Sequence, residues 1–235
     1  GEIRERIDQL RLITGMDIRH VWHEDDGYRR QMILNKAILE TSTPYIIFTD
    51  GDCVPRNDFL SVHVGLAEKG RFLSGGYCKL PMNLSKLISR DDILQQRSFE
   101  FPWLHKNGLR GASQRRKLTA RGAWGKFLDF ITPASPTFNN CNSSAWKEDI
   151  IAVNGYDERM QYGGADREFG ERLSNAGILG KQIRHQAIVI HLDHDRGYKT
   201  EESVRKNIAI RKEVNRNNVN WTPYGIKKDI PGQYR

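Results

Sequence analysis

The sequence predicts an α/β domain in which helices flank a doubly wound, mostly parallel sheet. Segments of helical and of strand-like periodicity alternate along the first half of the chain, which is typical of this class. The apolar runs are only about four residues long, as at 45–48 and 187–190, and such runs suit strands that are buried on both faces. With 235 residues, of which 38% are hydrophobic and 28% charged, the chain can bury one sizeable core, and its composition excludes collagen, coiled coil and wholesale disorder.

The first four elements are predicted from periodicity and from the residues that interrupt it. Residues 2–11 carry apolar side chains at helical spacing, and residues 18–22 are expected to form a strand. Residues 29–40 return to the helical period, and Pro44 ends that helix because proline disfavours the helical conformation in the residue before it. The apolar run that follows predicts a strand over residues 45–49.

The alternation continues along the rest of the chain. Helices are predicted over residues 59–68, 147–153 and 165–176, and strands over residues 72–77 and 188–191. Residues 101–128 interrupt this order and differ in composition. They hold seven basic residues, four glycines and no acid. We expect them to be a long, partly mobile surface excursion, and we expect the polar tail from residue 201 to be helical at first.

The charge balance favours anionic partners. Lys and Arg number 37 against 29 Asp and Glu, so the formal net charge is +8, which suits nucleotides, nucleic acid or an acidic membrane face. The three cysteines are far apart and form no C-x-x-C, which argues against a disulfide framework and a structural zinc site and fits a reducing cytoplasm. No apolar run approaches the length of a membrane-spanning helix, and the charged start of the chain has no signal-peptide core.

Two carboxylates follow the predicted strand 45–49 directly, in the triplet Asp50-Gly51-Asp52. Ligands of open parallel sheets bind beyond the carboxyl ends of the strands. A divalent cation such as Mg²⁺ or Mn²⁺ prefers oxygen ligands and can bridge a diphosphate at such a place. The triplet is therefore a candidate metal and nucleotide site, although a solvated turn explains an isolated triplet equally well.

A second candidate carboxylate stands at the start of the predicted helix 165–176. The pair Gly163-Gly164 leads into this helix, so Asp166 falls in its first turn, where the helix dipole favours a negative charge. A carboxylate held there can act as a general base toward an attacking hydroxyl. The alternative is an ordinary acidic first turn.

Two further polar stretches lie next to predicted elements. His191 and His194 enclose Asp193 at the end of the predicted strand 188–191, and a neutral imidazole is a good ligand for Mn²⁺ among oxygens. In the first turn of the predicted helix 29–40, Arg29 or Arg30 could contact a nucleotide. For each of these residues a structural role is the competing interpretation. The chain holds no Walker loop, G-x-G-x-x-G, H-E-x-x-H or G-x-S-x-G.

The order of these motifs resembles family-2 glycosyltransferases of the GT-A fold, particularly bacterial members whose C-terminal half is similar to that of animal β-1,4-galactosyltransferases. The resemblance covers about residues 1–200. It rests on the strings Tyr28-Arg29-Arg30-Gln31-Met32-Ile33-Leu34-Asn35-Lys36-Ala37 and Ile46-Ile47-Phe48-Thr49-Asp50-Gly51-Asp52, and on Asn142-Ser143-Ser144-Ala145-Trp146 through Asn154-Gly155-Tyr156-Asp157 to Gly163-Gly164-Ala165-Asp166-Arg167-Glu168.

The resemblance implies roles in binding the nucleotide and the metal. Arg30 would lie against the nucleotide, Asp50 would contact the ribose or the metal, and Asp52 would ligate the metal. His194 would complete the metal site, with His191 as the alternate. The implied cofactor is Mn²⁺ or Mg²⁺.

The resemblance also implies roles in binding the substrate and in catalysis. Asp166 would deprotonate the acceptor hydroxyl, and Tyr162 would stack on a sugar. Gly163, Gly164 and Glu168 would line the substrate site, with Glu168 compensating for Ala165, where the family usually has an acid. The family also begins with an apolar strand and an Asp-rich turn that bind uracil, and this first strand is not recognisable here.

The function implied is a metal-dependent inverting transfer of a sugar from a UDP-sugar to a hydroxyl of a glycan or glycolipid, in the synthesis of a bacterial surface polysaccharide. The expected location is the cytoplasm, with peripheral contact at the inner face of the cytoplasmic membrane. A single GT-A domain is expected over residues 1–200, followed by a polar C-terminal tail over 201–235. Within the domain we expect a nucleotide and metal half over about 1–80, the basic excursion over 101–128, and an acceptor and catalytic half over 138–200.

Two alternatives come from other functional classes. A non-catalytic basic module could bind nucleic acid or an anionic glycan through residues 106–126, but these basic residues are not interleaved with stacking aromatics at regular spacing, so nucleic acid is not the expected partner. A sugar nucleotidyltransferase would also use Asp and Mg²⁺, but it would need a Gly-rich basic loop after its first strand.

Overall fold

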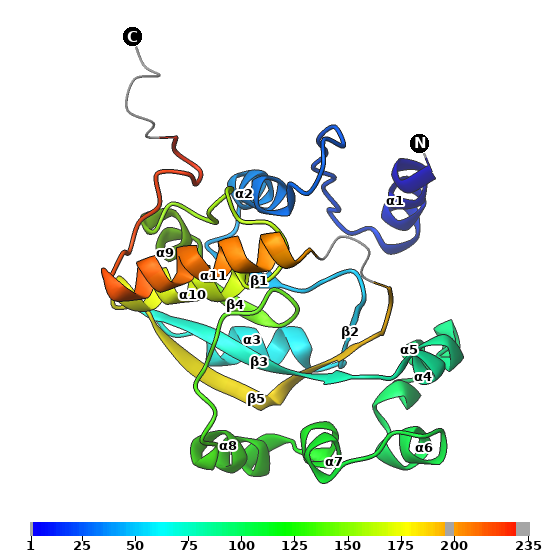
Figure 1. Ribbon diagram of the computed structural model, residues 1–235. Coiled ribbons are helices and arrows are strands. Elements are labelled where there is room, and N and C mark those ends of the chain that lie inside the picture. The colour runs from blue at the N-terminus through cyan, green and yellow to red at the C-terminus, as the bar shows by residue number, and fades with distance from the viewer. Residues whose placement is uncertain (1, 196–199, 229–235) are drawn as a thin grey trace.

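A single five-stranded sheet forms the centre of the molecule. The computed structural model describes residues 2–195 and 200–228. The strands stand in the order β1-β4-β3-β5-β2 (Figure 1). Their bounds are β1 Tyr45–Phe48, β2 Cys53–Pro55, β3 Arg71–Lys79, β4 Ser143–Trp146 and β5 Leu179–His191.

The sheet is mixed, so the expectation of a mostly parallel sheet is wrong in this detail, although the α/β class is confirmed. Strands β3 and β5 pair in parallel, whereas β4 runs antiparallel to both β1 and β3, and β2 runs antiparallel to β5. Continuous apolar runs indicate burial on both faces of a sheet, and this burial is the same for either strand direction. Direction is set by the connections, which periodicity does not reveal.

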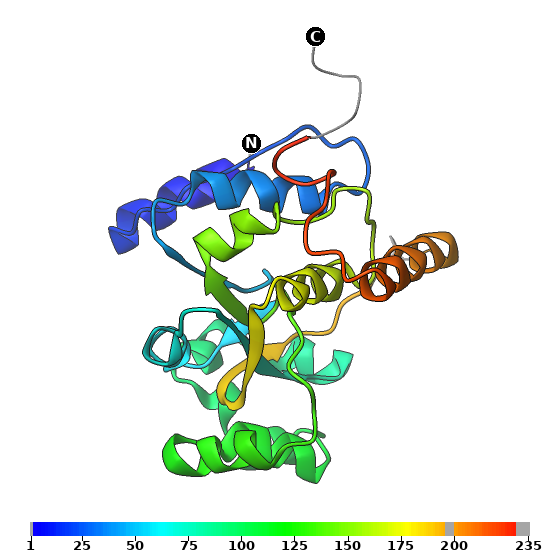
Figure 2. The same cartoon turned by 90° about the vertical axis from the view of Figure 1, so that its left-hand side faces the viewer.

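Helices cover both faces of the sheet. In Figures 1 and 2 the helices α2, α9, α10 and α11 lie on one side of it and α6, α7 and α8 on the other. The bounds of the helices are α1 Glu2–Thr14, α2 Arg30–Glu40, α3 Phe59–Leu66, α4 Met82–Leu87, α5 Arg90–Leu94, the 3-10 turn Arg97–Phe99, α6 Phe101–Lys106, α7 Ala112–Thr119, α8 Gly122–Ile131, α9 Lys147–Ala152, α10 Ala165–Asn175 and α11 Glu201–Arg216. Within the described residues, no helix has both the length and the apolar character that crossing a membrane requires.

The core on the α10 side is built from aromatic rings. Phe138 packs edge-on against Phe48 and Phe169, with ring centroids 5.4 and 4.8 Å apart. Tyr156 stacks on Phe169 at 4.4 Å and donates a hydrogen bond to Asn140. Aromatic pairs of this geometry stabilise a core beyond the area that they bury, so they fix α10 firmly on the sheet.

The basic segment 101–128 is ordered, which corrects the expectation of a mobile excursion. It forms α6, α7 and most of α8, and its residues Leu104 and Leu118 are buried against the sheet. In short helices only a few positions face the core. The sequence pattern of this segment is dominated by its exposed basic side chains, so it did not reveal these apolar contacts.

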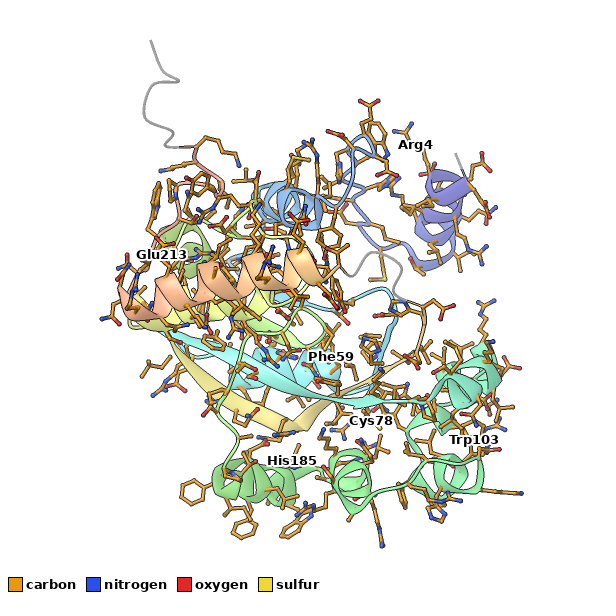
Figure 3. All side chains as sticks on the ribbon, in the orientation of Figure 1. Arg4, Phe59, Cys78, Trp103, His185 and Glu213 are labelled. Atoms are coloured by element: carbon orange, nitrogen blue, oxygen red, sulfur yellow. The ribbon has the colours of Figure 1, made fainter. Side chains whose placement is uncertain are left out.

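Polar contacts also hold this helical layer on β5. The buried guanidinium of Arg56 donates to the carbonyls of Ala120 and Gln186 at 3.2 and 2.5 Å. The carboxylate of Asp129 in α8 accepts hydrogen bonds from the His185 backbone and from the Gln186 side chain. His185 accordingly lies between the sheet and α8 in Figure 3.

Three other predicted elements differ from the structure. Residues 18–22 form no strand, and Ile18 instead accepts hydrogen bonds from Arg11 of α1. Strand β5 begins at Leu179 rather than at residue 188. The start of the predicted tail forms α11, as expected, but α11 packs on the domain through Ile210 and Val214; residues 229–235 of the predicted tail lie outside the described residues.

Candidate functional site

One cavity gathers most of the predicted site residues. It has a volume of about 630 Å³ and lies between the start of α2, the turn from β1 to β2, the loop before α10, and the end of β5. It is lined by the predicted residues Arg30, Asp50, Asp52, Tyr162, Gly163, Gly164, Asp166, His191 and His194. These residues come from four separate stretches of the chain, so their convergence is a property of the tertiary structure.

Asp50 is held by a cation at one side of this cavity. Arg30, the first residue of α2, forms an ion pair with the Asp50 carboxylate. Burial raises the pKa of Asp50, the Arg30 charge opposes that rise, and the nearby Asp52 and Asp166 add to it. The cavity therefore concentrates negative charge, which attracts cations.

Asp52 faces two imidazoles. Its Oδ2 lies 2.9 Å from Nε2 of His194 and 3.5 Å from Nε2 of His191. The Nδ1 atom of His191 lies 2.9 Å from the Leu192 carbonyl, so it carries the proton and leaves Nε2 as the ligand atom. A carboxylate and two imidazoles around one point are a suitable ligand set for a divalent transition metal.

Cys53 is a fourth possible ligand that the sequence did not indicate. Its thiol, the Asp52 carboxylate and the His191 imidazole place their ligand atoms within 4.8 Å of one another. The pKa of this buried thiol is raised, first by its hydrogen bond with Cys141 and then by burial, so the group stays protonated. Oxygen and imidazole ligands suit Mn²⁺ or Mg²⁺ better than a thiol does, so His194 is the more suitable third ligand.

Asp166 lies in the first turn of α10, as predicted. Gly163 and Gly164 have φ angles of 102° and 82°, which L-residues with side chains rarely adopt, and this conformation lets the chain turn sharply into the helix. The Asp166 Oδ1 accepts the Arg167 backbone N–H at 2.9 Å. The carboxylate lines the cavity.

Asn207 of α11 fixes the loop before Asp166, and sequence reasoning missed it. Its side-chain NH₂ donates to the carbonyls of Gln161, Tyr162 and Gly163 at 3.0, 3.1 and 2.8 Å. Asn207 is 1% exposed, so these bonds form away from water. A polar residue in a predicted tail carried no signal that it would reach the loop before α10.

Gln31 and Tyr28 are two further lining residues that no motif singled out for a role. Gln31 is 2% exposed, and its Oε1 has no hydrogen-bond partner among the described residues. An orphaned buried acceptor beside a cavity is suited to an N–H or O–H group of a ligand. The ring of Tyr28 lies edge-on to that of Tyr162, with centroids 6.3 Å apart.

Glu168 does not line the cavity, which contradicts its predicted substrate-binding role. Its carboxylate pairs with Arg172 one turn later at 2.6 Å, and both side chains are 0% exposed. Arg172 also donates to the carbonyls of Val153 and Gly155. Glu168 lies two positions after Asp166 and therefore points to the opposite side of α10, where the pair joins this helix to the preceding loop.

The string Asn154-Gly155-Tyr156-Asp157 is structural. Asn154 donates to the carbonyls of Thr222 and Lys227. Gly155 has a φ of 68°, and a Cβ there would lie 2.4 Å from the Asn35 side chain. Asn35 exchanges hydrogen bonds with the backbone of Tyr156, so this string positions the α10 region rather than contacting a ligand.

A second cavity of about 660 Å³ adjoins the first. It lies between β3, α7, the loop around residues 135–141, and β5. Both cavities are lined by Asp50, Tyr162, Asp166 and His191, so these side chains stand at the boundary between them. The arrangement offers space for two ligands that meet at Asp166.

Comparisons with known proteins place this geometry in a class. The family model described as the N-terminal domain of galactosyltransferase matches residues 128–195, which include the loop before α10, Asp166 and both histidines. No curated protein sequence matches the chain significantly.

Two solved structures are similar to this one. A mannosyltransferase from Pyrobaculum calidifontis, solved with GDP-Man and Mn²⁺, has a TM-score of 0.51 and 14% sequence identity, covering 83% of this chain and 45% of that chain. A mycobacterial protein has a TM-score of 0.44 and 13% identity, covering 86% of this chain and 54% of its own. The chain spans about half the length of these two proteins.

The fold is that of a GT-A glycosyltransferase, and the predicted resemblance is confirmed. The chain is thus similar to glycosyltransferases in two respects, the fold as a whole and the segment 128–195. The individual roles predicted for the site residues stay predictions, as does the division of the domain into a nucleotide half and an acceptor half.

Proposed function

We propose that this protein is a metal-dependent inverting glycosyltransferase that moves a sugar from a UDP-sugar to a hydroxyl of a glycan or glycolipid. One observation carries the proposal: Asp52, Asp166 and the two histidines, from distant parts of the chain, line a single cavity. We further propose that the product belongs to a bacterial surface polysaccharide and that the protein works in the cytoplasm.

The metal would be held by Asp52, His191 and His194. The convergence of one carboxylate and two imidazoles supports this assignment, and Mn²⁺ is the better fit than Mg²⁺ because imidazole ligands favour it. When bound, the cation would neutralise the charge that develops on the departing diphosphate. Arg30, paired with Asp50 at the same cavity, would add positive charge beside the nucleotide.

In the proposed step, Asp166 takes the proton of the acceptor hydroxyl as its oxygen attacks the anomeric carbon. The bond from that carbon to the diphosphate oxygen breaks, and the electron pair leaves with UDP. A single displacement of this kind inverts the anomeric configuration. The position of Asp166 between the two cavities supports it, because the base must lie where donor and acceptor meet.

Helix α8 is proposed to contact an anionic membrane surface. Trp124, Phe127 and Phe130 are 55%, 50% and 88% exposed, and Figure 3 shows rings projecting from α8 away from the sheet. The exposed cations Arg121 and Lys126 lie at the N-cap of α8 and within the helix itself. A helix that joins an aromatic face to basic residues suits the interface of an anionic bilayer.

The nucleotide and metal assignment is tested by thermal unfolding. UDP with Mn²⁺ should raise Tm, because a ligand that binds only the folded state stabilises it by about 2.7 kcal/mol at a hundred times its Kd. Asp52→Asn should abolish this rise, whereas Asp25→Asn, an exposed acid that does not line the cavity, should keep it.

Parallel titrations identify the nucleobase and the metal ion that the site prefers. Replacing Mn²⁺ by Mg²⁺ should reduce the rise in Tm, and EDTA should remove it. A rise with GDP but not with UDP would overturn the uridine assignment. The absence of a rise with either nucleotide would contradict the proposed site.

A further inference from the structure

The second cavity is lined by an excess of positive charge. Four cations, from β3, α7, α10 and β5, line it: Lys79, Lys117, Arg167 and Arg184. Its carboxylates, Asp50 and Asp166, belong to the boundary with the first cavity. The remainder of the second cavity is therefore cationic, and this region adjoins the proposed base.

Two of these cations, Lys117 and Arg184, are half-buried and have no carboxylate partner among the described residues. Lys117 Nζ instead donates to the Tyr77 carbonyl at 3.1 Å. Burial lowers the pKa of Lys117, and the neighbouring Arg184 charge lowers it further. By contrast, Lys79 is compensated, since its Nζ lies 3.3 Å from Asp193.

The backbone around both residues is firmly held. The register between β3 and β5 shifts at Gly75 and Gly76, so Arg184 falls in the irregular part of β5. A Cβ on Gly76 would lie 2.1 Å from the Arg184 carbonyl, so the two strands approach closely there. On α7, the residue after Lys117 is the buried Leu118. The two cations thus project from rigid elements rather than from a loose surface.

We propose that Lys117 and Arg184 bind an anionic group, a carboxylate or a phosphate, on the acceptor glycan. The inference rests on the proposed function, because it assigns the second cavity to the acceptor of that reaction. A guanidinium and an ammonium that face one cavity form charge-assisted hydrogen bonds with such a group. An anion between them offsets their mutual repulsion, because it attracts both charges at shorter distance. The acceptor hydroxyl would then be presented to Asp166 at the cavity boundary.

Binding of three simple sugars tests this assignment. Kd values are measured for glucose, glucuronic acid and glucose 6-phosphate by calorimetry, with and without UDP and Mn²⁺. Both anionic sugars should bind at least tenfold more tightly than glucose, as expected of about 1.5 kcal/mol or more for a hydrogen bond to a charged group. Comparison of the two anions shows whether a carboxylate or a phosphate fits better.

Lys117→Met and Arg184→Met should each remove most of this preference, since methionine keeps the apolar stem but not the charge. Arg116→Met is the matched control, because Arg116 is an exposed cation on the same helix that does not line the cavity. Without ligand, Arg184→Met should keep or raise Tm, because it removes one of two repelling charges, whereas Lys117→Met also loses the hydrogen bond to the Tyr77 carbonyl. A lower Tm in Arg184→Met would indicate a structural role and overturn the proposal.

The remaining outcomes are distinguishable. Equal affinity for glucose and the anionic sugars, or an equal loss in Arg116→Met, would overturn the anion site. A second outcome is that anionic sugars bind more tightly than glucose although UDP and Mn²⁺ leave Tm unchanged. That outcome would overturn the proposed transfer reaction, and the anion site could then no longer be assigned to an acceptor. The proposal is supported if UDP and Mn²⁺ raise Tm in all three variants. In addition, only Lys117→Met and Arg184→Met should lose the preference for anionic sugars.

Discussion

At the scale of single residues, the three acids of the first cavity differ in their partners. Asp50 pairs with Arg30, and Asp52 faces two imidazoles. Asp166 forms no ion pair among the described residues, and its Oδ1 accepts a backbone N–H of its own helix. A base needs capacity to take up a proton, whereas a metal ligand or a charge partner has already committed its lone pairs. The partners thus favour Asp166 as the base.

Asp166→Asn should lower the transfer rate by about 10²–10⁴, the usual contribution of a positioned general base. The change in Tm caused by UDP and Mn²⁺ should stay intact, because the amide keeps the shape of the side chain. Asp91→Asn is the control, since Asp91 is an exposed acid in the first turn of α5. Transfer at the wild-type rate in Asp166→Asn would refute the assignment.

His63 is a buried imidazole that should make stability depend on pH. Its Nδ1 lies 2.7 Å from the Ser144 hydroxyl and its Nε2 lies 2.8 Å from Asn142 Oδ1. Burial lowers the pKa of His63 from 6.5 to about 4. The unfolded chain therefore binds a proton at a higher pH than the folded protein does, so stability is complete above pH 6.5 and falls as the pH decreases toward 4.

The expected loss is about 3 kcal/mol of unfolding free energy between these two pH values. Denaturant titrations at several pH values measure it. His63→Gln should flatten the difference, and His105→Gln, at an exposed position, should leave it unchanged. An identical pH slope in wild type and His63→Gln would show that His63 is not the group responsible.

At the scale of elements, α11 controls the loop that leads into α10. The side chain of Asn207 holds three successive carbonyls, so the position of Asp166 depends on a helix some 40 residues later in the chain. The glycines in this loop give it little stiffness of its own. The hydrogen bonds from α11 therefore hold this loop, and with it the proposed base, in one position.

Asn207→Ala should lower kcat by about tenfold or more, because displacements near 1 Å at a reacting group can cost a factor of about a hundred. The effect on KM for the donor should be small, since the metal ligands come from other elements. Asn215→Ala is the control, because Asn215 lies on the exposed face of the same helix and bonds only within it among the described contacts. Equal losses in both variants would indicate general weakening of α11 instead.

At the scale of the whole molecule, the two faces of the sheet have different proposed functions. The α10 side and the strand ends form the proposed reaction cleft. The α6–α8 layer lies on the other face of the sheet (Figure 1), and its outer side chains are aromatic and basic. The layer also supplies Lys117 to the second cavity. Contact with a membrane through α8 would thus place the surface next to the cavity that we assign to the acceptor.

Vesicle sedimentation tests that contact. The protein should bind vesicles that contain phosphatidylglycerol and not those of phosphatidylcholine alone, and added salt should weaken binding by screening the charges. Replacing both Phe127 and Phe130 by Ser should reduce binding at least tenfold, because two exposed rings lose the apolar interface. Leu12→Ser removes an 87% exposed apolar side chain from α1 and should have no effect. Binding that is insensitive to salt and to the Phe variants would contradict the proposal.

Local sequence patterns determined the class and the order of the main helices and strands after residue 29. They also singled out residues that the structure brings to one cavity, although Glu168 is not among them. Glycine pairs, chain-breaking residues and short apolar runs act over a few residues, so their effects can be read along the chain. Such patterns predict Asp166 in the first turn of a helix and Asp50 at the end of a strand, and both placements are confirmed.

Tertiary contacts decided the remainder. The antiparallel direction of β4, the burial of Glu168 against Arg172, the reach of Asn207 and the proximity of Lys117 to Arg184 all depend on residues far apart in sequence. A polar side chain has the same local pattern whether it meets solvent, a carbonyl or another charge. Only packing, which sets burial and partners together, determines which of these it meets.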